Sequence, residues 1–193
     1  MAKMSVVATI LFPIIANGNA AANGFTTLHN SEFAFSARLP AGYRVCKVKD
    51  QDKEIGFYIW LKNPMTACDD GMSNKGPFIN VYAAYNSSFQ RDVRSINARY
   101  CNGPPIDKKT TDTIKSISFK GHVSSVCGMY AAGDMVEVVA STVAGSWPDA
   151  EDEDSRYSKR IYYNATLRTS RKNFDNDIVL FKDFVRRVSI SLQ

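Results

Sequence analysis

The sequence predicts an α+β fold, with a single antiparallel β-sheet of about six to seven strands packed with two main helices. Three observations lead to this prediction. Several runs alternate apolar and polar residues, as half-buried strands do, whereas two other segments repeat apolar residues at helical intervals. The strands come in neighbouring runs that are interrupted by a helix and then resume, which favours an antiparallel sheet covered by the two helices. Residues 23–193 are expected to form one domain of this kind.

The predicted strands are bounded by turn-forming residues. The first alternates over residues 33–39, with Leu39 as its last apolar position, and ends at Pro40-Ala41-Gly42. Tyr43 and Val45 begin the next strand. The dense aromatic and β-branched run Gly56–Leu61 is typical of a central strand. The remaining predicted strands are Phe78–Tyr85, Thr113–Phe119, His122–Tyr130, Met135–Val143 and Ile161–Arg168.

Both predicted helices carry start signals in addition to their periodicity. The first opens on the capping-box spacing of Ser87-Ser88-Phe89-Gln90, continues to Tyr100 and is stopped by Asn102-Gly103-Pro104-Pro105. The second begins near Asp175 or Asn176 and has basic residues at its C-terminal end, where cations suit the helix dipole. Residues 189–192 are expected to finish the chain as a short strand.

Residues 1–22 have the features of a secretory signal peptide. Lys3 supplies a positive start, an apolar run of about 13 residues follows, and small residues precede a predicted cleavage site after Ala22, with Ala20 as the alternative. This run is shorter than the roughly 20 residues that a membrane-spanning helix needs. The chain is therefore expected to be periplasmic or secreted, without a stable membrane anchor.

Composition limits the kinds of partner. The chain has 24 basic and 19 acidic side chains, a formal net charge of +5, which becomes +4 once Lys3 is removed with the signal peptide. This mildly basic balance lacks the charge clustering of a nucleic-acid-binding protein. Nucleic acid is therefore not expected as a partner.

All four cysteines lie in the part of the chain that is expected to be exported, where thiols can pair. Four cysteines allow three connectivities. Proximity in sequence favours Cys46 with Cys68 and Cys101 with Cys127, and the other two connectivities stay open at this stage. The gaps between the cysteines are too long for the paired ligands of a zinc site, so no metal is expected.

Recognisable catalytic and cofactor-binding motifs are absent from the sequence. His122 and Cys127 are the strongest base and nucleophile candidates. Five residues apart on one strand, they would point to opposite faces, so we assign Cys127 to a disulfide. His29 is expected to be exposed to solvent. The sequence thus predicts no catalysis and no cofactor.

The most unusual segment of the chain is acidic. Five carboxylates in six residues follow a tryptophan. Such a segment is expected to be a surface loop between two strands, because like charges repel and do not pack. Three interpretations are open: a solvated loop that aids solubility, a calcium site without EF-hand spacing, or a contact for a basic partner anchored by the tryptophan. The candidate partner-binding residues are Trp147, Asp149, Glu151, Asp152, Glu153 and Asp154.

A long loop and a set of aromatic residues are two further groups that could form a binding surface. The segment Asn63–Pro77 is longer than a tight hairpin needs, and a bonded Cys68 would hold it ready for recognition, so it is the second candidate interaction surface. Aromatic residues within the apolar strands are instead assigned to the core. These are Phe57, Tyr58, Trp60, Phe78, Tyr82 and Tyr85.

The stretch Phe33–Tyr43 (FAFSARLPAGY), a helix about midway, and a closing helix that runs into Val188–Leu192 (VSISL) resemble the layout of the PsbP-like superfamily. Members of that group mostly act as binding or assembly modules, so the resemblance implies a non-catalytic role and transfers no site residues. In size, export and paired cysteines the chain is also similar to periplasmic immunity proteins, which neutralise toxins delivered by neighbouring bacteria.

The function predicted from the sequence is therefore non-catalytic. We expect an exported, periplasmic protein that binds another macromolecule, a basic protein in particular, in the manner of an immunity or inhibitor protein that neutralises a toxin. Two other classes stay open. One is an envelope assembly or scaffold module, and the other is a cofactor-free envelope hydrolase built from carboxylates.

Overall fold

The computed structural model describes residues 24–50, 53–62, 68, 76–87, 90–144 and 160–191. The predicted signal peptide, residues 1–22, lies outside the described residues. The described part of the chain forms nine strands and three α-helices, which confirms the α+β class. In order, the elements are β1 (Phe25–Asn30), β2 (Phe35–Pro40), β3 (Arg44–Asp50), β4 (Lys53–Trp60), β5 (Phe78–Tyr85), α1 (Val93–Tyr100), α2 (Lys108–Ile114), β6 (Ser124–Ala131), β7 (Met135–Ala144), β8 (Ile161–Ser170), α4 (Phe174–Arg186) and β9 (Ser189–Ile190), with a 3-10 turn at Arg171–Asn173.

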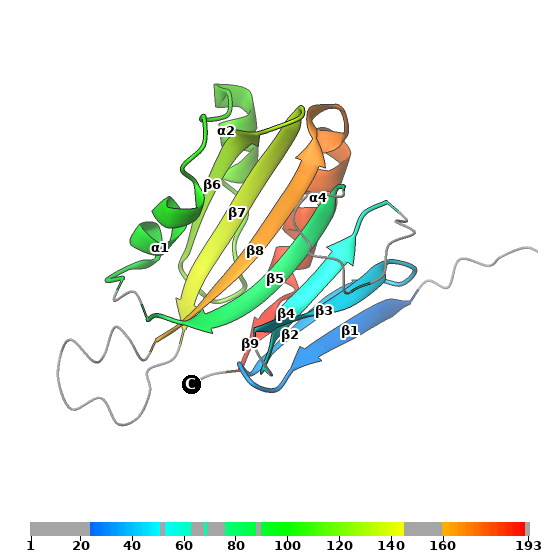
Figure 1. The fold of residues 1–193 in the computed structure, drawn as a ribbon, viewed down its shortest axis with the longest axis vertical. Helices are drawn as coiled ribbons and strands as arrows, with labels where there is room; N and C mark the ends of the chain where they lie inside the picture. The colour runs from blue at the N-terminus through cyan, green and yellow to red at the C-terminus, as the bar shows by residue number, and fades with distance from the viewer. Residues whose placement is uncertain are drawn as a thin grey trace, which may run out of the picture.

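The strands divide between two sheets, both antiparallel (Figure 1). The larger sheet has six strands in the order β3-β4-β5-β8-β7-β6, and the smaller has the order β1-β2-β9. The sequence predicted a single sheet. That detail is wrong because β2 pairs with β1 and β9 rather than with β3, and because β1 was missed. In β1 only Leu28 and Asn30 are buried, which is too weak an alternation to predict a strand.

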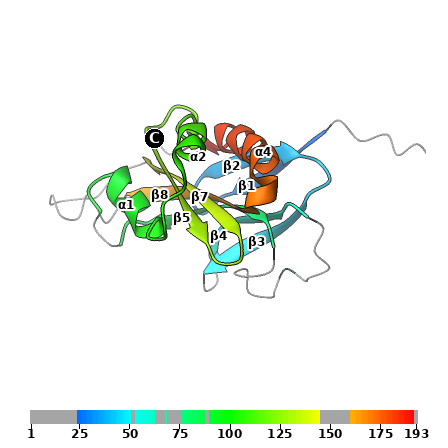
Figure 2. The same cartoon turned by 90° about the horizontal axis from the view of Figure 1, so that it is seen from above.

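The helices lie on opposite faces of the six-stranded sheet (Figure 2). On one face, α2 and α4 pack together with the small sheet over the main apolar core, which includes Phe57, Val81, Leu167 and Phe181. On the other face, α1 packs over β6 and β7. A second, smaller core lies on this face over β3, β4 and β5 and contains Cys46, Val48, Tyr58, Trp60 and Phe78. We call the face that carries α1 the α1 face.

Strand β3 differs from its prediction in the side chains that it buries. Tyr43 and Val45 were expected to begin this strand, and they are only partly buried, whereas the buried residues are Cys46 and Val48. The reason is that the two faces of this strand contact different parts of the core. Val45 packs against the main core from one face, while Cys46 and Val48 join the small core on the other face.

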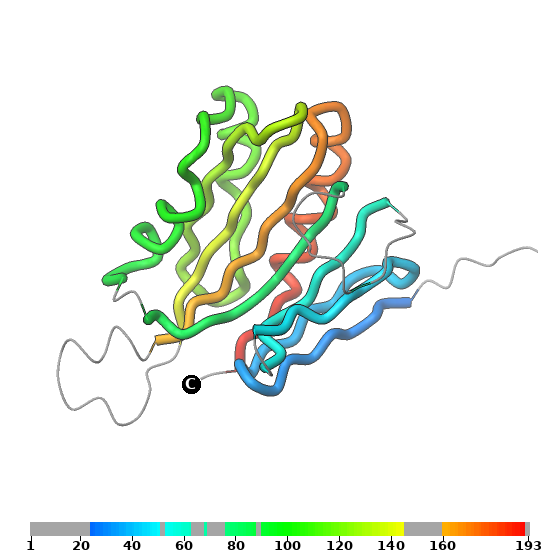
Figure 3. Tube along the Cα trace, in the orientation of Figure 1, coloured from blue at the N-terminus to red at the C-terminus, as the bar shows by residue number. Residues whose placement is uncertain are grey.

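The C-terminal elements α4 and β9 pack beside the N-terminal strand β2. Figure 3 shows the last helix and the final residues beside the first strands. Helix α4 contacts β2, and Phe35 of β2 lies opposite Ile190 of β9. The predicted apolar face of this helix is confirmed, since Ile178, Phe181 and Val188 are all buried. No helix within the described ranges is both long and apolar enough to span a membrane.

The predicted first helix begins later than expected. Helix α1 starts at Val93, and its N-cap is Asp92, which accepts a hydrogen bond from the Ser95 backbone N–H at 2.8 Å. Of the predicted capping box Ser87–Gln90, Ser88 and Phe89 lie outside the described residues. The Asn86 side chain accepts a hydrogen bond from the Gln90 N–H at 3.0 Å and donates one to the Gln90 carbonyl at 2.6 Å.

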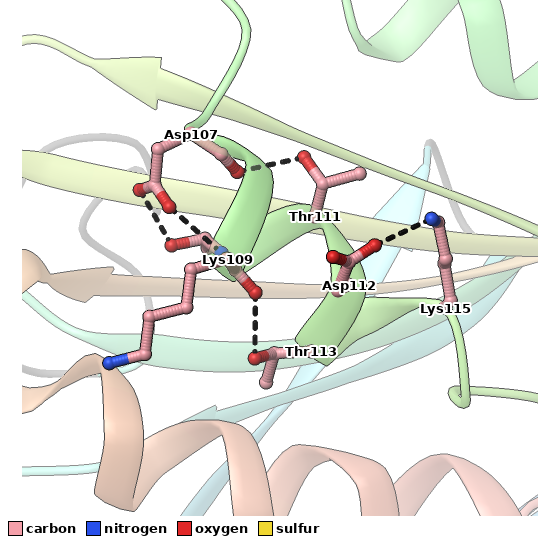
Figure 4. A network of polar contacts seen from close by, with 7 residues as sticks. Asp107, Lys109, Thr111, Asp112, Thr113 and Lys115 are labelled. Carbon is pink, nitrogen blue, oxygen red and sulfur yellow. Dashed lines mark hydrogen bonds and ion pairs between the residues drawn. The ribbon is translucent and has the colours of Figure 1, made fainter.

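The predicted strand Thr113–Phe119 is wrong. Residues 108–114 form α2, and the remainder is a turn in which Ile117, packed in the core, donates its N–H to the Ile114 carbonyl. Ile114 and Ile117 are three residues apart, which matches about one helical turn, whereas the prediction treated this stretch as the alternation of a strand. Asp107 is the signal that was missed, because its carboxylate caps the helix through the backbone N–H of Thr110 at 2.9 Å (Figure 4).

Replacing Asp107 is expected to lower the thermal midpoint of unfolding near neutral pH. The hydrogen bond from the Thr110 backbone N–H, with bonds from the Thr110 and Tyr130 hydroxyls, lowers the pKa of Asp107 to about 2. Because the pKa of Asp107 is lower in the folded protein than its usual value of 3.8, the ionised carboxylate stabilises the fold at pH values above 3.8. This contribution is lost as the pH falls through about 2. The difference in the thermal midpoint of unfolding between the wild type and Asp107→Ala should therefore become smaller in acid.

Asp112→Ala is the matched control for this prediction. Asp112 is exposed on the same helix and forms an ion pair with Lys115, but it caps nothing. If the difference in thermal midpoint between Asp107→Ala and the wild type stayed constant from neutral to acid pH, this would contradict the role of the ionised cap.

Candidate functional site

Two disulfides tie segments to the α1 face of the large sheet. Cys46 is bonded to Cys68 and Cys101 to Cys127, which confirms the pairing that sequence proximity favoured. Cys46 lies on edge strand β3 and Cys127 on the opposite edge strand, β6. The two bonds fit an extracytoplasmic protein, because such bonds persist in oxidising compartments.

Both disulfides lie at the ends of one row of cross-strand neighbours. The row crosses all six strands, and each member lies directly opposite the next. Its members are Cys46, Tyr58, Asn80, Thr166, Val139 and Cys127. Directly opposed residues share a face of the sheet, so the first disulfide attaches the segment around Cys68, and the second attaches the end of α1, to the same face.

A buried polar network holds α1 against this face. The Asn97 amide donates to the Ser141 hydroxyl at 3.1 Å and to the Val139 carbonyl at 3.2 Å. Ser141 in turn donates to Asn164, whose amide donates to the Tyr82 hydroxyl at 3.2 Å. Asn97, Ser141 and Asn164 are almost fully buried, and their mutual bonds meet the requirement that buried polar groups find partners.

Three tyrosines continue the network toward one end of the sheet. Tyr82 and Tyr100 are within hydrogen-bonding reach, and the Tyr100 hydroxyl donates to the Tyr162 hydroxyl at 3.2 Å. Burial raises the pKa of Tyr100 to about 12 and also raises the pKa values of Tyr82 and Tyr162. All three phenols therefore stay neutral and hydrogen-bonded under ordinary conditions. The network fixes the position of Tyr162, the last member.

At that end the sheet forks. Strand β5 pairs with β8 as far as Tyr85, opposite Ile161, but its pairing with β4 stops at Tyr82, opposite Gly56. The beginning of β4 turns instead toward β1, where the Asn30 amide donates to the Glu54 carbonyl at 2.7 Å. Gly56 permits the close approach at the fork, since a Cβ there would lie 2.1 Å from the Val81 carbonyl oxygen.

A cleft of about 420 Å³ opens where β4 leaves β5. This volume lies within the range of small-ligand sites. Its aromatic walls are Phe33, Tyr85 and Tyr162, and the Phe33 and Tyr85 ring centroids are 5.2 Å apart. We call it the fork cleft and define it by the described residues that line it, which are Phe33, Asp50, Lys53, Ile55, Ala84, Tyr85, Ser87 and Tyr162.

Charged groups stand at the rim of the fork cleft. The Lys53 ammonium forms an ion pair with Glu32 at 3.0 Å and lies 5.8 Å from the centre of the Tyr85 ring. The hydrogen bond and charge of Glu32 raise the pKa of Lys53, so this side chain stays protonated. Asp50 is exposed, and within the described residues its carboxylate has no ion-pair partner. Glu32, Asp50 and Lys53 together leave one net negative charge at the rim.

Hydrogen bonds from neighbouring residues fix the positions of Phe33 and Tyr162 in the walls of the fork cleft. The Tyr163 hydroxyl donates to the Phe33 carbonyl at 2.8 Å, and the Phe33 N–H donates to the buried Asn30 side chain at 2.8 Å. Tyr162 is held by Tyr100 on the other side of the cleft. Such support reduces the conformational entropy that these groups would lose on binding a ligand.

The partner-binding residues predicted from the sequence lie outside the described residues. They are Trp147, Asp149, Glu151, Asp152, Glu153 and Asp154. The described strands nevertheless fix where their segment is attached. Ala144, which ends β7, lies opposite Ile161, which begins β8, and Ile161 lies opposite Tyr85 of the fork cleft. We call this end of the large sheet the cleft end.

The fork cleft itself was not predicted. Tyr82 and Tyr85 were assigned to the core but are half-buried. Phe33 was placed in the first predicted strand, and it is buried in the turn that precedes β2. The aromatic assignments of Phe57, Tyr58, Trp60 and Phe78 to the core are confirmed. Gly56 is the one signal that would have helped, because an isolated glycine within a strand marks a bulge or a close backbone approach.

Of the candidate pair His122 and Cys127, the structure shows Cys127 in a disulfide. The sulfur of Cys127 is bonded to Cys101, so it offers no thiolate. His29 is exposed, as expected. Among the described residues, Asp50 is the one carboxylate that lines the fork cleft, and Asp183 the one that lines a surface cavity on α4. Within the described ranges, no group of three or more histidine, cysteine or acidic residues is arranged to hold a metal ion.

Comparison with known proteins gives similarity to solved structures only. No family model and no curated protein matches the chain. The solution structure of cyanobacterial PsbP (CyanoP) from Synechocystis is similar over 93% of this chain and 99% of that chain, with 11% sequence identity and a TM-score of 0.39. The chain is thus similar to a PsbP protein, the group that its sequence resembles, and the similarity is one of layout alone.

Proposed function

We propose that this protein is a non-catalytic, periplasmic binding protein whose partner is a basic protein bound at the cleft end of the sheet. The observation that carries the proposal is the register of β5, β7 and β8. It attaches the segment with five carboxylates next to the fork cleft, because Ala144, Ile161 and Tyr85 are successive cross-strand neighbours. A cleft and a negatively charged segment at the same end favour one binding region.

Charge supports the choice of a basic partner. Glu32, Asp50 and Lys53 leave one net negative charge at the rim of the fork cleft. Between β7 and β8 the sequence has five carboxylates and three cations, Arg156, Lys159 and Arg160, a net charge of −2. Opposite charge accelerates association by steering the encounter and suppresses binding of partners with like charge. An immunity or inhibitor role against a basic toxin is the specific form that we propose.

Replacement of the acidic residues tests this proposal. In a variant with Glu151, Asp152, Glu153 and Asp154 changed to serine, capture of a basic protein from envelope or competitor-culture fractions should be lost or weakened. With the purified pair, the association rate should fall roughly tenfold or more at low salt and its salt dependence should flatten, because long-range attraction is screened by ions. The association rate measured over a salt series is the readout.

A variant with Asp112, Asp134 and Asp175 changed to asparagine is the control. These carboxylates are exposed and are not part of the acidic segment or the fork cleft. They should leave the association rate almost unchanged. Equal effects of both variants, or none from the serine variant, would contradict the proposal. A resident envelope protein captured independently of the acidic segment would favour a scaffold module instead.

A further inference from the structure

We propose that the fork cleft receives the cationic side chain of an arginine or lysine from the partner protein. This inference rests on the proposed function and names the chemical group that the cleft recognises. It depends on described residues only and needs no contribution from the acidic segment. Three features support it: the aromatic walls, the charge of the rim, and the position of Lys53.

The walls suit a cation that carries an apolar stem. Tyr85 and Tyr162 are half-buried aromatic residues of the lining, and Ile55 and Ala84 add aliphatic surface. Phe33 is only 2% exposed, and its ring lies 5.2 Å from the Tyr85 ring. Aromatic faces attract ammonium and guanidinium groups, and the attraction grows when water is excluded. The methylene groups of arginine or lysine would pack on the aliphatic surface while the charge stays near the rings and the rim.

The rim complements a positive charge. Glu32 already pairs with Lys53, and Asp50 leaves a carboxylate for an incoming cation. Ser87 also lines the cleft, and a hydroxyl can accept a hydrogen bond from a guanidinium or an ammonium. An anionic ligand would meet the Asp50 carboxylate, and Lys53 is the one cation among the described residues of the lining.

Lys53 shows that a cation is accommodated at this position. Its ammonium lies 5.8 Å from the centre of the Tyr85 ring, which is within the distance of a cation–π contact. The side chain is largely exposed, with 59% of its surface accessible, so it can move aside at little cost. Lys53 therefore acts as an internal competitor for the ring that a partner's cation would use.

Binding of a small probe tests the inference without the partner. N-acetyl-arginine amide is titrated into the mature, oxidised protein, and chemical shifts of Ala84, Tyr85 and Ser87 are followed by NMR. N-acetyl-citrulline amide, which has the same shape without the charge, is the ligand control. We expect saturable shifts at the cleft with the arginine probe and roughly tenfold weaker or undetectable binding with citrulline, because the charge–ring and charge–carboxylate attractions are lost.

Two exposed substitutions give opposite expected signs. Asp50→Asn should weaken binding of the arginine probe roughly threefold to tenfold, because it removes a carboxylate that lines the cleft. Lys53→Met should strengthen it about threefold, because it removes like charge from the Tyr85 ring. A site for anions would show the reverse signs. Both residues are on the surface, so these variants are expected to fold.

The result that overturns the inference is the absence of saturable shifts at the cleft, or shifts with unchanged affinity in both variants. These outcomes are separate from failure of the proposed function. If the probe binds the cleft but the partner captured from cells is not basic, the proposed function fails. If a basic partner depends on the acidic segment but is unaffected by Asp50→Asn and Lys53→Met, the inference fails and the proposed function stands.

Discussion

Replacing Cys101 and Cys127 together by alanine is expected to lower the free energy of unfolding by roughly 3 to 4 kcal/mol. The bond closes a loop with a sequence separation of 26 residues, and constraining such a loop in the unfolded chain gives about this value in the chain-entropy model. Chemical denaturation of the oxidised wild type and the double variant, compared by midpoint and slope, measures the loss.

The second disulfide provides a matched comparison. Cys46 and Cys68 are separated by 22 residues, so the double alanine variant of this pair should lose nearly the same free energy. The structural consequences should differ. Loss of the bond to Cys101 should loosen α1 and the contact from Tyr100 to Tyr162, whereas loss of the bond to Cys68 should leave that contact intact. A loss below about 1 kcal/mol for both pairs would contradict the account.

Gly56→Ala is expected to be the most damaging conservative substitution in the sheet. Its new methyl group would lie 2.1 Å from the Val81 carbonyl oxygen and 2.6 Å from the Tyr82 Cα. Both atoms belong to the backbone of β5, so relief requires β4 and β5 to separate. Overpacking typically costs about 1 to 3 kcal/mol, and we expect a value of about 3 kcal/mol or more here because no side chain can yield.

Gly128→Ala is the control for this substitution. Its methyl group would also be close to a neighbour, 2.4 Å from the Ile106 Cδ1, but that atom is the end of a flexible side chain. We expect a loss of about 1 kcal/mol, since Ile106 can change its rotamer. Equal losses for the two variants, measured by chemical denaturation, would show that the fork does not depend on backbone contact at Gly56.

Local patterns predicted much of the fold. The long strands were predicted within a few residues because their periodicity agrees with their burial, as in Phe78–Tyr85 and Met135–Ala144. The errors arose where one signal competed with another. Thr113–Phe119 alternates like a strand, but the cap at Asp107 starts a helix before it. β1 went unnoticed because most of its residues are exposed.

The candidate site was less predictable than the fold. The charge of residues 149–154 is visible in the sequence, but the fork cleft brings together side chains from β3, β4, β5, β8 and the turn that precedes β2. No local pattern encodes that meeting, because it depends on which strand pairs with which. The disulfide pairing was predictable only as a preference, since the register that aligns Cys46 and Cys127 in one row spans six strands.

Site-specific photo-crosslinking in cells tests most directly whether a basic protein binds at the cleft end. A photoreactive amino acid is placed at Ser87, an exposed residue of the fork cleft, and in a second strain at Ala132, an exposed residue in the turn between β6 and β7 at the other end of the sheet. We predict that Ser87 crosslinks to one basic protein, at a peptide that contains arginine or lysine, and that Ala132 does not. Equal crosslinking from both positions, or a crosslinked partner that is acidic, would contradict the account.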